Sequence, residues 1–207
     1  NYKGYFLMIF NDTYLPEGYK KYNELLTAIS SISELYSKSE TPYIDPRFVE
    51  NSFCLAFDAV NLSRHDNAFD ASKIIDNLKI GIGLKTFCAN INNNGISESK
   101  TEKIAEFNSD AFQLKNLSVL DATLKIAELR NARINSAILE YGIDKSIYHC
   151  VIRFHDKINP TNKYILLKEY DYDPIVVSDI VCTDKNFNPL SLEQQLENSS
   201  DRLFFTD

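Results

Sequence analysis

Residues 63–87 read SRHDNAFDASKIIDNLKIGIGLKTF, and this stretch predicts a β-hairpin. One apolar-rich arm runs from about Phe69 to Ile75 and a second from Lys79 to Phe87, with Asp76-Asn77-Leu78 as turn residues between them. If the hairpin folds about Asn77-Leu78, Asp70 lies opposite Lys85 on one face of the ribbon. Directly opposed residues bring their Cβ atoms to about 4.5–5.5 Å. We therefore expect a carboxylate and an ammonium group to lie side by side.

The second arm has two distinct faces, because side chains alternate along a strand. Gly81, Gly83 and Lys85 share one face, where bare backbone would let a phosphate approach closely. Phosphodiester cleavage needs cations that neutralise the phosphate and activate water, and Mg²⁺ prefers carboxylate ligands. A lysine beside such a site can hold a phosphate oxygen or orient the water. The pattern favours this chemistry, and an ordinary cross-strand pair on a surface hairpin is the alternative.

The spacing of these residues resembles that of the PD-(D/E)xK nuclease superfamily, and within it the type II restriction endonucleases. Asp70 is followed by a twelve-residue gap and Gly83-Leu84-Lys85, and it is preceded by Arg64 and Asp66 in an R-x-D-x-x-x-D string. The family has an acid where Gly83 stands, and a proline where this chain has Phe69. The resemblance covers roughly residues 45–170. It implies Mg²⁺ as cofactor, Asp70 as the central metal ligand and Lys85 as the catalytic cation.

A second carboxylate must come from outside the hairpin, because Gly83 is not an acid. Nucleases of this superfamily often add a glutamate from a helix before the hairpin, so the resemblance implies a catalytic and metal-binding role for Glu50. This residue follows Pro46, which suits the first position of a helix. The alternative is a solvated first-turn glutamate favoured by the helix dipole. Weaker candidates are Asp66, Asp76, Glu98 and Glu106, of which Asp76 fits the turn better.

The order of predicted elements indicates an α/β fold. We expect a strand at 5–10, helices at 19–38 and from Pro46, the hairpin, a loop at 90–99, a long helix at 114–141 that Gly142 ends, and strands at 146–154, 163–171 and 175–182. This order matches a restriction-endonuclease-like core with a mixed central sheet flanked by helices. We expect a single domain over residues 1–207, with the core at roughly 45–180 and a strand–helix extension at 1–40. Both ends look cut, so we expect part of a longer protein.

Composition limits the classes of function. The net charge of −7 argues against a protein that coats nucleic acid without specificity, although one basic cleft could coexist with it. The four cysteines form no C-x-x-C pair, which excludes a zinc ribbon and fits a cytoplasmic protein. The sequence contains no run of eighteen apolar residues, so it predicts no membrane span.

Double-stranded DNA is the expected partner, and a homodimer would suit cleavage of both strands of a symmetric site. Basic and amide side chains are the usual contacts to phosphates and base edges, and solvated surface positions are the alternative for each. The candidates are Arg64, His65, Lys100, Lys103, Gln113, Arg130 and Arg133.

We therefore expect a Mg²⁺-dependent DNA endonuclease, a type II restriction enzyme or its catalytic domain. One alternative is a noncatalytic DNA-binding or effector-binding module with a degenerate nuclease fold. A second is an oligomerisation or scaffold domain that uses the long helix as its interface. Nucleotide-binding enzymes and Ser or Cys hydrolases are disfavoured, because the chain lacks a Gly-rich phosphate loop and a G-x-S-x-G motif.

Overall fold

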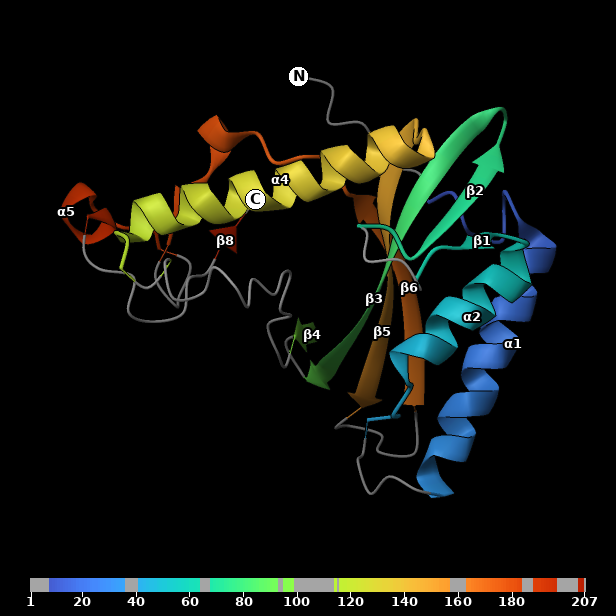
Figure 1. The fold of residues 1–207 in the computed structure, drawn as a ribbon. Helices are drawn as coiled ribbons and strands as arrows, with labels where there is room; N and C mark the ends of the chain where they lie inside the picture. Colours follow the sequence, from blue (N-terminus) through green and yellow to red (C-terminus); the bar gives the residue numbers. More distant parts are fainter. Residues whose placement is uncertain are drawn as a thin grey trace. The chain divides into compact units, whose positions relative to one another are not determined.

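The computed structural model describes residues 8–35, 41–63, 68–92, 95–98, 114, 116–156, 163–183, 188–196 and 205–206 (Figure 1). The chain divides into two compact units. One comprises residues 1–102 and 137–173, and the other comprises residues 103–136 and 174–207. The single domain expected from the sequence stays a prediction.

The first unit is built on one mixed β-sheet, which confirms the α/β class. Its strands lie in the order β1-β2-β3-β5-β6, and β4 pairs with β3 outside this path. β3 and β5 are parallel, and every other neighbouring pair is antiparallel. The strands are β1 Val60–Asn61, β2 Ala71–Ile75, β3 Leu78–Asn92, β4 Gly95–Glu98, β5 Lys145–Asp156 and β6 Lys163–Asp171. The loop expected at 90–99 is wrong where β3 and β4 occupy it.

The hairpin turn between β2 and β3 differs from the expected one by a single residue. Asp76 and Asn77 both adopt positive φ, 51° and 65°, which is the backbone of a two-residue type I′ turn. Ile75 therefore pairs with Leu78, and Ala71 with Ile82. A turn centred on Asn77-Leu78 would shift this pairing by two residues. Because the turn is at Asp76-Asn77, the expected pairing of Asp70 with Lys85 is wrong.

Two helices precede the hairpin and cover one face of the sheet (Figure 1). α1, Pro16–Ile32, begins three residues before the expected helix, because Pro16 supplies a preset first position. A short 3₁₀ helix, η1 Ser33–Leu35, follows it. α2, Pro46–Phe57, begins at the expected proline; the Asp45 side chain caps it by accepting from the Arg47 N–H.

The core between these helices and the sheet is rich in aromatic rings. Phe10, Tyr22 and Phe53 are fully buried and pack around His149 of β5. The other buried members of this core are Leu26, Ile44, Val49, Phe57, Ala71, Ile80, Ile82, Leu84, Ile147, Val151 and Leu167. The expected face of isoleucines and leucine on the second hairpin arm is therefore confirmed as the buried one.

A buried histidine–glutamate pair anchors the segment before α1 to this core. His149 Nδ1 lies 3.0 Å from Glu169 Oε1, and both side chains are fully buried. The same carboxylate accepts hydrogen bonds from the backbone N–H groups of Ile9 and Phe10, at 2.6 and 3.0 Å. Ile9 and Phe10 form a bend, and Met8 belongs to no regular element, so the expected strand at 5–10 is wrong where the structure describes it. Residues 1–7 lie outside the described range.

α4, Val119–Tyr141, belongs to both units, since the division falls between residues 136 and 137. It begins five residues later than expected, because the Ser118 hydroxyl accepts from the Asp121 N–H and caps it there. Gly142 follows with φ of 60°, and the expected stop is confirmed. Among the described residues, no helix combines the length and the apolar character that a membrane span requires.

The other elements that the structure describes in the second unit are short: η2 Val177–Asp179, β7 Val181–Cys182, α5 Leu192–Gln195 and β8 Phe205–Thr206. β7 pairs with β8 in a small sheet of their own. The continuous strand expected at 175–182 is wrong, because residues 177–179 form a 3₁₀ turn, in which Asp179 N–H donates to the Val176 carbonyl. Asn131 of α4 holds the segment before η2 through two hydrogen bonds with the backbone of Ile175.

Candidate functional site

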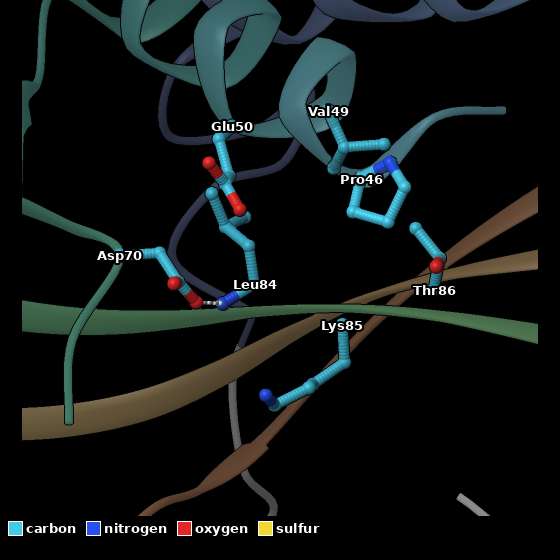
Figure 2. A pocket seen from close by; sticks show the side chains of 7 residues that line it. All are labelled: Pro46, Val49, Glu50, Asp70, Leu84, Lys85 and Thr86. Atoms are coloured by element: carbon cyan, nitrogen blue, oxygen red, sulfur yellow. Dashed lines mark hydrogen bonds between the residues drawn. The ribbon is translucent and has the colours of Figure 1, made fainter. Parts of the chain in front are cut away.

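A pocket of about 170 Å³ lies between α2 and β3. Two carboxylates line it, Glu50 from α2 and Asp70 from the segment before β2 (Figure 2). The remaining lining residues are Pro46, Val49, Leu84, Lys85 and Thr86. The structure therefore brings the two acids singled out in the sequence into one pocket.

Backbone pairing holds Asp70 in place although it precedes β2. Its N–H donates to the Ile82 carbonyl at 2.9 Å, and its own carbonyl accepts from the Leu62 N–H at 2.8 Å. The side chain is fixed as well, because Oδ2 accepts from the Leu84 N–H at 2.7 Å. This last bond is charge-assisted, and it keeps the carboxylate on the side of β3 that α2 covers (Figure 2).

Glu50 points from α2 toward the same side of β3 (Figure 2). Its side chain is 14% exposed, and Oε2 lies 3.2 Å from Nη1 of Arg47, one helical turn earlier. The same guanidinium nitrogen donates to the carbonyl and hydroxyl oxygens of Ser63. Glu50 is thus a largely buried carboxylate with a cationic partner at the surface, in contrast to the solvated glutamate that was the alternative.

The thiol of Cys54 is affected by the charges of both acids. It lies one turn after Glu50 in α2, and its side chain is half-buried. Burial, the negative charge of Glu50 and that of Asp70, in this order, raise the pKa of the Cys54 thiol from 9.0 to about 11. The charges of both carboxylates therefore act on the Cys54 thiol.

Lys85 contributes to the pocket wall, but its ammonium lies elsewhere. Its side chain leaves β3 on the face opposite Asp70 and Glu50 (Figure 2), with Nζ 6.0 Å from the centre of the Tyr148 ring. The expectation that Asp70 and Lys85 share one face is wrong. Alternation along β3 explains this, because Leu84 and Thr86 point toward α2 and the residue between them must point away.

Aromatic rings occupy the space beside the two glycines of β3. A Cβ atom on Gly81 would lie 2.9 Å from the Phe69 ring. One on Gly83 would lie 3.0 Å from Tyr172 and 3.1 Å from Tyr148, whose rings stack at 3.8 Å. These glycines admit rings to the sheet surface, and the expected bare backbone for a phosphate is wrong.

The donor set of the pocket fits a hard divalent cation with few protein ligands. Mg²⁺ keeps several waters and is commonly held by one or two carboxylates, which Asp70 and Glu50 could provide. A closed zinc centre would need four protein ligands. Within the described part of the chain, no cluster of three or more His, Cys, Asp or Glu residues could hold a metal ion.

No protein-family model, curated protein or solved structure gives a significant match to this chain. The likeness to nucleases stays a prediction. It rests on the residues of the pocket and on the order of the elements.

Most of the expected DNA contacts cannot be placed. Arg64, His65, Lys100, Lys103 and Gln113 lie outside the described residues, as do Asp66 and Glu106 among the weaker acids. Arg130 and Arg133 belong to the second unit, whereas the residues that line the pocket belong to the first, and each arginine already interacts with other groups. Asp76 is an exposed turn residue, and the side chain of Glu98 in β4 is not described.

Sequence reasoning missed two residues of the site, Arg47 and Cys54. Both stand at helical spacing from Glu50, three residues before it and four after it. Side chains three and four apart share one face of a helix, so a search along α2 from Glu50 would have found them.

Proposed function

We propose that this chain is a Mg²⁺-dependent endonuclease that hydrolyses phosphodiester bonds in DNA. The observation that carries the proposal is the meeting of Asp70 and Glu50 in one pocket over β3. The choice of DNA, and of a restriction-endonuclease-like fold, follows from the resemblance of the motif to type II restriction enzymes.

The element order supports the same proposal. α2 precedes the antiparallel meander β1-β2-β3, and the connection containing α4 leads to β5, which runs parallel to β3. This is the arrangement expected for the nuclease core, with the central acid beside the second strand and an additional acid on the preceding helix. Fold analogy alone does not give chemistry, so the proposal depends on the two acids.

Each residue then has a defined task. Asp70 and Glu50 would hold the metal ion, which when bound neutralises phosphate charge and lowers the pKa of water. The hydrogen bond from Leu84 N–H orients the Asp70 carboxylate before any ligand arrives. Such preorganisation avoids reorientation during the reaction. Lys85 does not contact the substrate in this proposal.

One observation favours a second candidate, a noncatalytic DNA-binding module. The pocket lacks the ammonium group that the nuclease motif supplies, because Lys85 points to the other face of the sheet. A fold that has lost this cation could retain DNA binding without cleavage.

Plasmid relaxation and gel shift separate the two candidates. Wild type should nick or linearise supercoiled plasmid in Mg²⁺, and Asp70→Asn and Glu50→Gln should each reduce the rate by at least about 10²-fold, as loss of an electrostatic contact in a transition state does. All three proteins should shift a duplex in Ca²⁺. Binding without cleavage by wild type over a range of duplex sequences would establish the noncatalytic module instead.

A further inference from the structure

Arg47 is the cation bound to the pocket carboxylate Glu50. Its guanidinium Nη1 lies 3.2 Å from Glu50 Oε2, 3.1 Å from the Ser63 carbonyl oxygen and 3.2 Å from the Ser63 hydroxyl. The Arg47 side chain is 64% exposed, whereas that of Glu50 is 14% exposed. The ion pair thus joins a buried carboxylate to a cation that reaches solvent at the first turn of α2.

A metal ion and Arg47 would compete for the same group. Glu50 and Asp70 line one pocket, and the guanidinium offsets the charge of Glu50. A divalent cation held by Glu50 takes over that compensation, and two cations on one carboxylate repel each other. Guanidinium groups also match the geometry of phosphate oxygens, to which they donate paired hydrogen bonds.

We propose that Arg47 is a phosphate-binding residue that is released by metal binding. It pairs with Glu50 in the metal-free protein, and it binds a phosphate of the nucleic acid once Glu50 holds the metal ion. This inference rests on the proposed metal site and adds to it the cation that Lys85 does not supply. Arg47 would thereby strengthen substrate binding once the metal is loaded.

The test compares Arg47→Gln with Lys73→Gln. Glutamine is a shorter polar side chain that carries no charge. Lys73→Gln removes one positive charge from the same unit, in an ion pair with Asp58 at 3.7 Å that does not involve the pocket. Two quantities are measured: the dissociation constant for Mn²⁺ by titration calorimetry, and that for a DNA duplex in Ca²⁺ by gel shift.

Opposite changes are expected for Arg47→Gln. Mn²⁺ should bind about two- to fivefold more tightly, the range that loss of one exposed ion pair supports. DNA should bind about two- to fivefold more weakly, because one phosphate contact is lost. Lys73→Gln should leave Mn²⁺ affinity unchanged. In a Glu50→Gln background, Arg47→Gln should no longer tighten Mn²⁺ binding.

The remaining outcomes overturn the inference in distinguishable ways. If Arg47→Gln weakens both ligands, Arg47 only ties α2 to Ser63. If both affinities stay unchanged, Arg47 takes part in neither interaction. Failure of wild type to bind Mn²⁺ would remove the metal site and this inference together. Opposite changes in a protein that never cleaves DNA would leave the exchange of Arg47 standing and refute the endonuclease.

Discussion

The Asp70 carboxylate accepts a hydrogen bond from the backbone N–H of Leu84, with 2.7 Å between Oδ2 and the nitrogen. This bond links the residue before β2 to the middle of β3, at the position where the pocket lies. Asp70 therefore has a structural role in addition to the proposed role as metal ligand, and two substitutions separate these roles.

Asp70→Asn should leave the free energy of unfolding within about 1 kcal/mol of wild type, because the amide oxygen can still accept from Leu84. Asp70→Ala should lower it by about 1–3 kcal/mol, the cost of a partly buried donor without its acceptor. Urea unfolding measures both values. Both variants should lose Mn²⁺ binding, and retention of Mn²⁺ affinity in Asp70→Asn would remove Asp70 from the metal site.

Lys85→Ala should have little effect on the proposed chemistry. Its ammonium contacts the Tyr148 ring on the face opposite the pocket, so we expect unchanged Mn²⁺ affinity and a stability loss of about 0.5–1 kcal/mol. Calorimetric titration and thermal unfolding give these quantities. A cleavage rate about 10²-fold below wild type in a stable variant would restore Lys85 as a catalytic residue.

The Cys54 thiol should remain protonated well above neutral pH. Peptide-level alkylation with iodoacetamide should show the reactivity of Cys54 rising with a midpoint near pH 11, since burial and the charges of Glu50 and Asp70 raise its pKa to about 11. Between about pH 9 and 11, the unfolded chain loses this proton while the folded chain keeps it, so the stability contribution of Cys54 should fall as pH rises.

Glu50→Gln provides the control for this assignment, because the charge of Glu50 raises the pKa of the thiol more than that of Asp70 does. The midpoint for Cys54 should then move to lower pH, whereas alkylation of the half-buried Cys88 should not change. An unaltered Cys54 midpoint in Glu50→Gln would show that the two side chains are not neighbours in solution.

Glu169→Ala should strongly destabilise the protein. It removes the partner of buried His149 and the acceptor of two backbone N–H groups, at Ile9 and Phe10. Loss of one partner from a buried pair costs about 3–5 kcal/mol. Glu128→Ala is the matched control, because Glu128 pairs with Lys125 at the surface and should contribute less than about 1 kcal/mol. Chemical denaturation that shows equal losses in both variants would contradict the burial of this pair.

Local signals in the sequence predicted many of the element boundaries. Pro46 predicted the start of α2 because proline suits the first helical position, and Gly142 marked the end of α4 because that residue adopts a positive φ. The alternation of Ile80, Ile82 and Leu84 with glycines predicted the two faces of β3. These features depend on residues close together in the chain.

The site depended on more distant relationships. The sequence did not decide whether the turn is Asp76-Asn77 or Asn77-Leu78, and the choice sets which residue lies opposite Asp70. The sequence also did not show that α2 would cover the face of β3 opposite Lys85, so it placed Lys85 on the side of the acids. Glu50 was assigned to the site from a resemblance, since its meeting with Asp70 is a tertiary contact.

The two-residue turn at Asp76 and Asn77 has a consequence for how this chain could diverge. Glycine at either position would keep the positive φ, so these two residues can be substituted. The length of the turn cannot change in the same way, because one inserted residue would reverse the side-chain faces of β3 relative to β2. Ile82 and Leu84 would then collide with the aromatic rings on the opposite face of β3, and Lys85 would be driven into the apolar core beneath α2. Descendants of this chain should therefore accumulate substitutions in the turn and almost never insertions or deletions.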